Sequence, residues 1–274
     1  MSDRLSVVVL SSWYPNPIVP LSGVFIEKQA CLLSQKSDVS VLFIHRISPK
    51  LFLRFLFSKK SFAEQDGDLT VYTRRVPSFE RISAKLDTLI VKYAARRLYD
   101  QYRKSHGKPD VIHAHLSYPG GVCGCMLGQR EDIPVAVTEH MSYLERFLTG
   151  GFEKELRFAF ASADRYFAVS NSLANRLVSY GLKRCDVLPN FLDENQFDKS
   201  SPELFDGFTV LCVAAMDDNK HMDRLVSAFD KLINDRGIDD VRLVLVGDGP
   251  ERENLLALVH NKHLENAVKF TGVV

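Results

Sequence analysis

The stretch DVIHAHLSYPGG, residues 110–121, carries an apolar run, two histidines and a pair of glycines. An apolar strand followed by a glycine-started helix is typical of open parallel sheets, in which ligands bind beyond the carboxyl ends of the strands. Strand side chains alternate between the two faces of a sheet, so His113 and His115 are expected to share one face. The stretch therefore predicts an α/β fold with a candidate ligand loop at this strand end.

The alternation of strand and helix continues on both sides of this stretch. Upstream, strands are expected at residues 5–13, 38–45 and 68–76, and helices at 22–35 and 82–104. Downstream, strands are expected at 133–140, 164–170 and 185–190, with helices at 152–163 and 171–181. Repeated strand–helix units predict a parallel sheet with helices on both of its faces.

This pattern lapses in the polar segment FLDENQFDKSSPELFDG, which predicts a linker over residues 191–207 between a first domain, 1–190, and a second, 208–274. The second domain repeats the pattern, with strands expected at 208–215, 241–246 and 267–274. Three strands are half of a doubly wound domain. We therefore expect this domain to be incomplete, with an uncovered sheet edge or face that favours self-association.

The composition is that of an ordinary globular chain of 274 residues, with 46% hydrophobic and 25% charged residues. The 35 basic and 34 acidic residues balance, so no nucleic-acid partner is expected. The five cysteines are scattered and odd in number, which argues against a disulfide framework. The apolar start is too short for a signal peptide or a membrane span, and a cytoplasmic location is expected.

Seven short motifs in a fixed order carry a family resemblance: SSWYPNP…SGVFIEKQA, DVIHAHLSYPGG, VAVTEH, RYFAVSNSL, VLPNFLDENQF, KHMDRLVSAF and LVLVGDGPE. Together they span almost the whole chain and resemble glycosyltransferase family 4, of the two-domain GT-B type. The resemblance implies two facing Rossmann-like parallel-sheet domains with the reaction in the cleft between them. The first would bind a saccharide or lipid-linked acceptor and the second a nucleotide-sugar donor, with no further cofactor.

The sequence departs from the family pattern at two places in the second domain. Lys220 matches a family lysine that holds the donor diphosphate, but Ala215 stands where the family often has an arginine. The family's later pair of glutamates, which contacts the donor sugar and ribose, lies beyond Val274. The chain is therefore expected to be truncated within the donor-binding domain, and residues 1–274 are expected to transfer sugar inefficiently.

His140 is the first candidate for a catalytic residue, because it closes the strand-like run VAVTEH and matches a family histidine beside the donor sugar. A histidine can bond to sugar hydroxyls and is readily tuned near neutral pH. Its neighbour Glu139 alternates away and is expected to be structural.

The other first-domain candidates have structural alternatives. His113 and His115 form half of a potential metal site, to which His140 and Glu139 would supply the remaining ligands. Nothing else in the sequence calls for a metal, and none is expected. We expect His113 to bond to backbone and His115 to face the ligand cleft. Gly23 either admits a phosphate or sugar to the backbone or makes only a turn. Ser170 is expected to cap a helix whose remaining N–H groups face the cleft.

In the second domain, the turn of Gly247, Asp248 and Gly249 resembles the family's loop near the nucleotide. With Lys220 and helix N-termini it would stabilise the negative charge that develops on the leaving diphosphate. A Gly-x-Gly turn without this context would be a weak signal.

Two basic segments indicate an anionic membrane surface as a further partner. Residues 46–60, RISPKLFLRFLFSKK, hold five basic residues and no acidic one, interleaved with leucine and phenylalanine, and residues 92–104 add five more basic residues. Such segments suit the inner, cytoplasmic interface of a membrane. The alternative is a core-packed helix with a solvated rim.

The activity expected from the resemblance is transfer of a sugar from a nucleotide donor to an acceptor hydroxyl, with retention at the anomeric carbon. A second hypothesis is a truncated, non-catalytic relative that binds nucleotide or sugar, which an assay of nucleotide-sugar hydrolysis would distinguish. A third is a sugar-nucleotide epimerase of the same architecture, which product analysis without acceptor would reveal.

Overall fold

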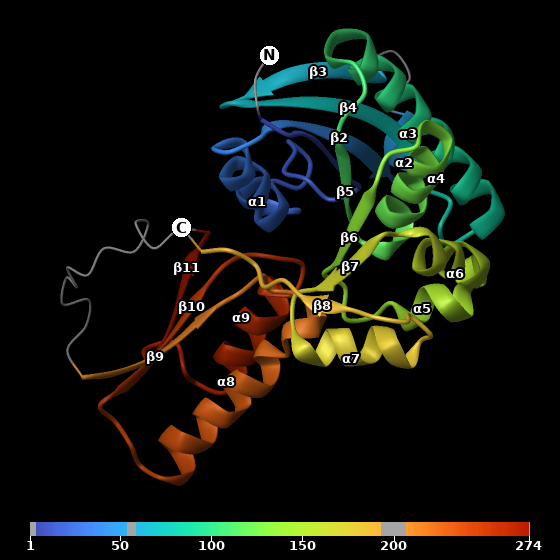
Figure 1. Ribbon diagram of the computed structural model, residues 1–274. Helices are drawn as coiled ribbons and strands as arrows, with labels where there is room; N and C mark the ends of the chain where they lie inside the picture. Colours follow the sequence, from blue (N-terminus) through green and yellow to red (C-terminus); the bar gives the residue numbers. More distant parts are fainter. Residues whose placement is uncertain (1–3, 54–58, 193–206, 274) are drawn as a thin grey trace. The chain divides into compact units, whose positions relative to one another are not determined.

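The computed structural model describes residues 4–53, 59–192 and 207–273, and the chain forms two compact units, Met1–Leu192 and Asp193–Val274 (Figure 1). We call them unit 1 and unit 2. The predicted linker 191–207 falls mainly on residues 193–206, which lie outside the described residues.

The described part of unit 1 is built on one eight-stranded sheet in the order β3-β4-β2-β1-β5-β6-β7-β8. Its strands are β1 (Ser6–Ser11), β2 (Asp38–Ile47), β3 (Ser61–Asp66), β4 (Leu69–Pro77), β5 (Val111–His115), β6 (Val135–Glu139), β7 (Arg165–Ala168) and β8 (Asp186–Val187). The helices are α1 (Val24–Ser34), α2 (Pro49–Leu53), α3 (Ala84–His106), α4 (Val122–Glu131), α5 (Glu145–Phe147), α6 (Glu153–Ser162) and α7 (Asn171–Ser179).

The predicted parallel α/β fold is confirmed, with one strand that the sequence analysis missed. β3 pairs antiparallel with β4, whereas every other pair in the sheet is parallel. β3 reads SFAEQD, and most of its residues are exposed. A short, polar edge strand has no buried face, so it lacks the apolar alternation from which strands are recognised.

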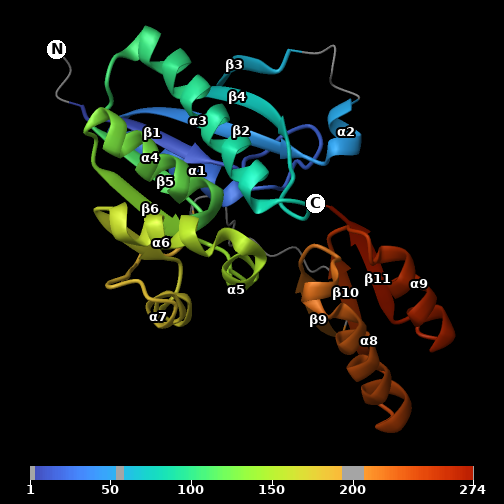
Figure 2. The ribbon, with the colours of Figure 1, turned by 90° about the vertical axis from the view of Figure 1, so that its right-hand side faces the viewer.

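Helices cover both faces of the unit 1 sheet, as Figures 1 and 2 show. On one face, α3, α4 and α6 pack on a core that includes Leu10, Leu42 and Ile112. On the other face, α1 packs through Ile26 and Ala30 on Val9 and Val41. Central strands buried on both faces are typical of doubly wound sheets, and their near-continuous apolar runs follow from this burial.

The long helix α3 has clear start and stop signals. Its N-cap Ser83 accepts a hydrogen bond from the backbone N–H of Leu86 at 3.3 Å. Arg103, Lys104 and His106 lie in the last turn, where positive charge favours the helix dipole. Ala94, Ala95 and Leu98 are fully buried against the sheet. The helix predicted over residues 82–104 is therefore confirmed to within two residues at each end.

β1 is the point at which the strand order reverses. Val7 pairs with Val39 of β2 on one side and with Val111 of β5 on the other. In open α/β sheets this topological switch point is where loops from neighbouring strands diverge and leave a ligand crevice. The loops after β1 and β5 are therefore the first places to look for a site in unit 1.

Unit 2 contains a three-stranded parallel sheet in the order β11-β10-β9. Its elements are β9 (Phe208–Val213), α8 (Met222–Asp230), β10 (Val241–Val246), α9 (Arg252–Asn261) and β11 (Val268–Gly272), as predicted for this part of the chain. Phe208, Leu211 and Val213 on the edge strand β9 are at least 62% exposed. Self-association through such a surface stays a prediction.

Candidate functional site

The loop after β1 in unit 1 is held by a close approach at Gly23. This residue has a φ of 72° and precedes α1. A Cβ atom at Gly23 would lie 2.6 Å from the carbonyl carbon of Trp13 and 2.8 Å from the backbone nitrogen of Tyr14. Both the backbone angle and the lack of space require glycine here, so the turn reading of Gly23 has direct structural support.

The histidines of β5 and β6 form a contiguous row at the carboxyl ends of these strands. The His113 and His115 rings lie 4.3 Å apart on one face of the sheet, as strand alternation predicts. His115 Nδ1 lies 3.0 Å from Nε2 of His140. Residues from two neighbouring strands are thus joined through their side chains.

The predicted environments of His113 and His115 need correction. His113 Nε2 bonds to the Thr138 hydroxyl at 2.8 Å, so its partner is a side chain of β6 rather than backbone. His115 is 1% exposed and does not present its ring to solvent. It supports His140 through the contact between His115 Nδ1 and His140 Nε2.

All three histidines are held neutral by their surroundings. Burial lowers the pKa of His113 to about 4, since desolvation disfavours the charged imidazole. Burial and repulsion from His113 lower the pKa of His140 to about 4, although the Asn190 side chain opposes the shift. Burial and the two neighbouring imidazoles lower the pKa of His115 well below its ordinary value.

His140 is half-buried, as His113 is, and other side chains contact it on two sides. One side is the hydrogen bond to His115, and the other is the Phe25 ring, whose centroid lies 4.6 Å away. Phe25 in turn meets Trp13 edge-on at 6.3 Å. The structure therefore brings the loop before Gly23, the start of α1 and the predicted catalytic histidine together at the switch point.

Glu139 organises the backbone of this site, which confirms its expected structural role. Its fully buried carboxylate accepts hydrogen bonds from the N–H groups of Ser117 at 2.7 Å, His140 at 2.9 Å and Met141 at 2.7 Å. The Tyr166 hydroxyl donates to the Ser117 hydroxyl at 2.7 Å. Burial raises the pKa of Glu139, while these hydrogen bonds oppose the shift. One side chain thus ties the end of β5 to the end of β6.

Ser170 follows β7 and caps α7, as predicted. Its hydroxyl accepts a hydrogen bond from the backbone N–H of Leu173 at 3.2 Å. The residue is exposed, and so are Asn171 and Ser172 in the first turn of the helix. Its position beside β6 in the sheet order keeps Ser170 at the same edge as His140.

The candidate phosphate-binding residues of unit 2 lie on two loops that hydrogen-bond to each other. Met216 N donates to the Asp248 carbonyl at 2.9 Å, and Glu251 N donates to the Met216 carbonyl at 2.9 Å. Lys220 is exposed at the end of a short 3-10 turn, Asp218–Lys220, and forms no ion pair with any described residue. The structure therefore brings the lysine loop and the Gly-Asp-Gly turn together at the carboxyl ends of β9 and β10.

Gly247 and Gly249 allow this close packing. A Cβ at Gly247 would lie 2.0 Å from the Ala214 carbonyl oxygen, and one at Gly249 would lie 2.4 Å from that of Met216. The Asp248 carboxylate accepts a hydrogen bond from Gly249 N at 2.7 Å. These contacts are structural, and they leave Ala215 and Lys220 exposed beside the turn.

The basic segment 46–60 has a different arrangement from the one expected. Arg46 is largely buried, and its Nη2 lies 2.8 Å from Asp87 and 3.0 Å from Glu80. Arg46 therefore belongs to an internal ion-pair network instead of a surface patch. The sequence alone does not reveal this network, because Asp87 on α3 lies 41 residues further along the chain. Lys59 and Lys60 are exposed, whereas residues 54–58 lie outside the described residues.

The described ranges of the chain contain no group of three or more His, Cys, Asp or Glu side chains arranged to hold a metal ion. No helix in them has the length and apolar character needed to cross a bilayer.

Comparison with known proteins gives two family matches that follow the two units. The family model described as Glycosyltransferase Family 4 matches residues 46–196, and that described as Glycosyl transferases group 1 matches residues 207–274. The chain is 28% identical over 176 residues to the N-acetyl-alpha-D-glucosaminyl L-malate synthase of Bacillus anthracis, covering 60% of this chain and 45% of that protein. It spans less than half of this relative.

A second relative matches along most of the chain. This is the putative teichuronic acid biosynthesis glycosyltransferase TuaC of Bacillus subtilis (strain 168), 25% identical over 289 residues, covering 93% of this chain and 69% of the relative. Among solved structures, Anabaena Alr3699/HepE in complex with UDP-glucose has a TM-score of 0.67 at 17% identity, covering 99% of this chain and 70% of that one. The structural likeness establishes the GT-B type of fold, and the match over more than half of the sequence establishes the family. The chain belongs to glycosyltransferase family 4.

Proposed function

We propose that this chain transfers a sugar from a nucleotide-sugar donor to an acceptor hydroxyl, with retention of configuration at the anomeric carbon. The observation that carries the proposal is His140, a neutral imidazole fixed at the switch point by His115 and Phe25. A neutral ring can donate or accept one hydrogen bond without holding a counter-ion. It is therefore suited to orient a sugar hydroxyl rather than to bind a phosphate.

Unit 2 is proposed to hold the donor through its phosphates. The leaving diphosphate gains negative charge during transfer, and a cation near the bridging oxygen lowers the barrier. Lys220, exposed beside the Gly247–Gly249 turn, is the residue proposed for this role. With positive charge supplied by the protein, the proposed reaction needs no metal ion.

The acceptor is proposed to be a saccharide, either free or linked to a lipid. The likeness to TuaC, whose name places it in teichuronic acid biosynthesis, supports a growing polysaccharide as the acceptor class. Unit 1 is proposed to bind it, because loops from β1, β5, β6 and β7 meet at one edge of its sheet.

Replacing His140 by alanine should lower kcat/KM for sugar transfer by about tenfold to a hundredfold, the loss expected for one hydrogen bond to a positioned substrate. Transfer would be measured by mass spectrometry of acceptor products with UDP-glucose as the probe donor. His260→Ala is the matched control, since His260 is exposed and bonds only to Glu265 among described residues. Equal rates for the His140→Ala variant and the parent chain would contradict the proposed role.

We further propose that unit 1 works on the cytoplasmic face of an anionic membrane. All five cysteines are free thiols, which suits a reducing compartment. Leu86, Leu89 and Tyr93 form an exposed apolar stripe on α3, and Leu89 is 59% exposed. Arg96 and Arg97 follow on the same helix and are exposed. An apolar stripe beside exposed cations fits the interface of a bilayer with negatively charged headgroups.

The double variant Arg96→Gln, Arg97→Gln should bind vesicles of phosphatidylglycerol about thirtyfold more weakly, because each basic residue near such a surface contributes about 1 kcal/mol. Binding would be measured by co-sedimentation at low and high salt, since screening should also weaken it. Lys36→Gln, Lys183→Gln removes two exposed charges from other elements and serves as the control. Binding that is insensitive to salt and to the α3 substitutions would remove the proposal.

A further inference from the structure

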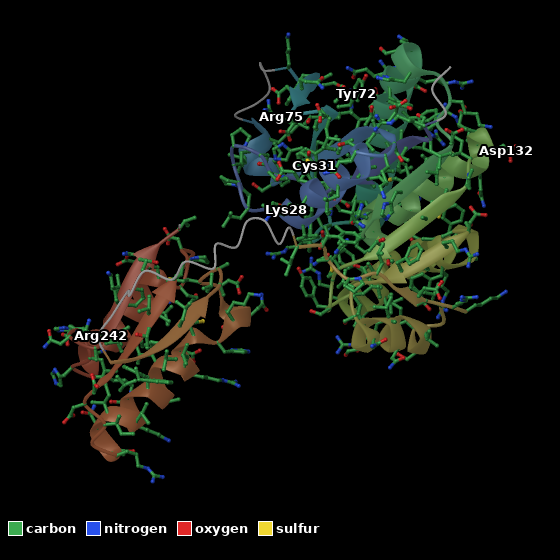
Figure 3. The ribbon with its side chains drawn as sticks, turned by 60° about the vertical axis from the view of Figure 1, so that its left-hand side comes forward. Lys28, Cys31, Tyr72, Arg75, Asp132 and Arg242 are labelled. Carbon is green, nitrogen blue, oxygen red and sulfur yellow. The ribbon has the colours of Figure 1, made fainter. Side chains whose placement is uncertain are left out.

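A cavity of unit 1 lies away from the histidine row, between the loop after β1 and the strands β2, β3 and β4. Its volume is about 250 Å³, near the lower end of small-molecule pockets, about 300 Å³. Phe43 and His45 of β2 line it together with Phe62 of β3 and Arg75 of β4. Figure 3 labels Arg75 on its strand, with Lys28 and Cys31 marking α1.

These side chains share a face because of the strand register. Phe43 pairs with Thr73, and Thr73 pairs in turn with Phe62. His45 pairs with Arg75, two residues further along β2 and β4 and therefore on the same face. Directly paired residues point to the same side of a sheet, so the pocket is a property of the backbone pairing.

Aromatic rings form two sides of this pocket. His45 stacks on Phe43 with ring centroids 5.0 Å apart and planes at 16°, and Tyr14 lies 5.9 Å from Phe43. The Arg75 guanidinium lies over the Phe62 ring at 4.8 Å. Flat aromatic faces of this kind complement the C–H face of a pyranose ring, which is apolar although its edge carries hydroxyls.

His45 supplies polar capacity that no described residue uses. It is 6% exposed and lines the cavity, and its ring forms no hydrogen bond to the described residues. A hydroxyl group bound in the cavity would form hydrogen bonds to the ring nitrogens of His45. Burial and the charge of Arg75 lower its pKa to about 4, so at neutral pH it offers one donor and one acceptor.

The charges around the pocket favour a neutral ligand over an anion. Glu64 and Asp66 line it together with the single cation Arg75. The Tyr14 hydroxyl donates to Asp66 at 3.1 Å, which fixes one carboxylate at the rim. Carboxylates accept hydrogen bonds from sugar hydroxyls but repel phosphate, whereas an arginine can donate to ring or hydroxyl oxygens.

We infer that this pocket binds one neutral pyranose ring. Its identification as part of the saccharide acceptor rests on the proposed function, whereas ring binding itself does not. Phe43, Phe62 and His45 form the contact surface for the ring, and Asp66 and Arg75 bond to its hydroxyls. The site therefore selects an uncharged sugar at this position of the acceptor.

The test uses the full chain without nucleotide sugar, with methyl α-glucoside, methyl α-galactoside and methyl N-acetyl-α-glucosaminide as probes. Saturation-transfer NMR should detect at least one of them. Its affinity should fall about tenfold in Phe62→Leu and in His45→Gln, the size of one lost contact or hydrogen bond. Circular dichroism of each variant establishes that it is folded. If one variant does not fold, the other still tests the inference.

Tyr143→Ala is the matched control, because Tyr143 is an exposed aromatic residue of the same unit. It should leave the affinity unchanged. Three outcomes would each overturn the inference: no binding of any of the three probes, an affinity of both pocket variants equal to that of the parent chain, or displacement of the bound probe by inorganic phosphate. This binding test contains no nucleotide sugar and therefore does not depend on sugar transfer. A protein that binds the glycoside here but fails to transfer sugar in the separate transfer assay would contradict only the proposed function.

Discussion

Lowering the pH from 7 to 5 should reduce the free energy of unfolding of unit 1 by about 2 kcal/mol for each histidine whose pKa falls from 6.5 to about 4 on folding. His45, His113 and His140 have this shift. The unfolded chain binds protons on these groups below pH 6.5, whereas the folded chain excludes them until about pH 4. Their contribution to stability is therefore complete above pH 6.5 and is lost as the pH falls towards 4.

The combined loss, on the order of 6 kcal/mol, is comparable with the whole stability of a typical domain, about 5–15 kcal/mol. Trp13, the single tryptophan of the chain, belongs to unit 1 and meets Phe25, so its fluorescence during urea titration reports this unit. His113→Gln should flatten the pH dependence, while His260→Gln, at an exposed site, should not. A urea midpoint that stays constant between pH 7 and pH 5 would show that the histidines are not held neutral.

Replacing Glu139 by glutamine should destabilise unit 1 by about 3 kcal/mol or more at pH 7. The carboxylate accepts three backbone hydrogen bonds, with Oε2 facing Ser117 N and Oε1 facing the N–H groups of His140 and Met141. An amide has only one oxygen. In either orientation its NH₂ group would therefore face at least one backbone donor, and that donor would lose its partner inside the protein.

Glu145→Gln is the control for this substitution, because Glu145 is exposed and the same chemical change there should stay within about 0.5 kcal/mol. The measurement is again urea unfolding followed by Trp13 fluorescence. The His140 ring should also become more mobile, since its own backbone nitrogen is one of the three donors. A stable Glu139→Gln variant would mean that the loops after β5 and β6 do not depend on this carboxylate.

The parts of the fold that the sequence predicted are those with strong periodicity. The helix over residues 82–104 has an apolar stripe and an N-cap serine, and the central strands are apolar runs. β3 was missed because four of its six residues are exposed and it has no run of alternating apolar residues. β8 is shorter than expected, with only Asp186 and Val187 in the strand. A strand as short as β8 forms only because β7 lies beside it, and two residues are too few to show an apolar pattern in the sequence.

The sequence placed the candidate residues at neighbouring strand ends, but it could not predict their contacts. Strand ends placed His115 and His140 at one edge, yet their contact depends on β5 and β6 being neighbours, with His115 paired to Thr138. The contact between the Phe25 and His140 rings was not predicted, because a phenylalanine at the start of a helix is usually a core residue. The sequence also suggested a surface position for Arg46, because its ion-pair partner Asp87 is distant in sequence.

The central position of β1 sets an order of events during synthesis. Among the described strands, β1 leaves the ribosome first, and it needs two partners. Its residue Val7 pairs with Val39 of β2 on one side and with Val111 of β5 on the other. The edge of β1 that pairs with β5 stays open until roughly 100 further residues have been synthesised. Their synthesis takes roughly 5–20 s at the usual rate of the ribosome. During that interval an apolar strand has an open edge, so the nascent chain is most exposed to mispairing before residue 115 emerges, and a chaperone that binds extended apolar segments would act at this stage.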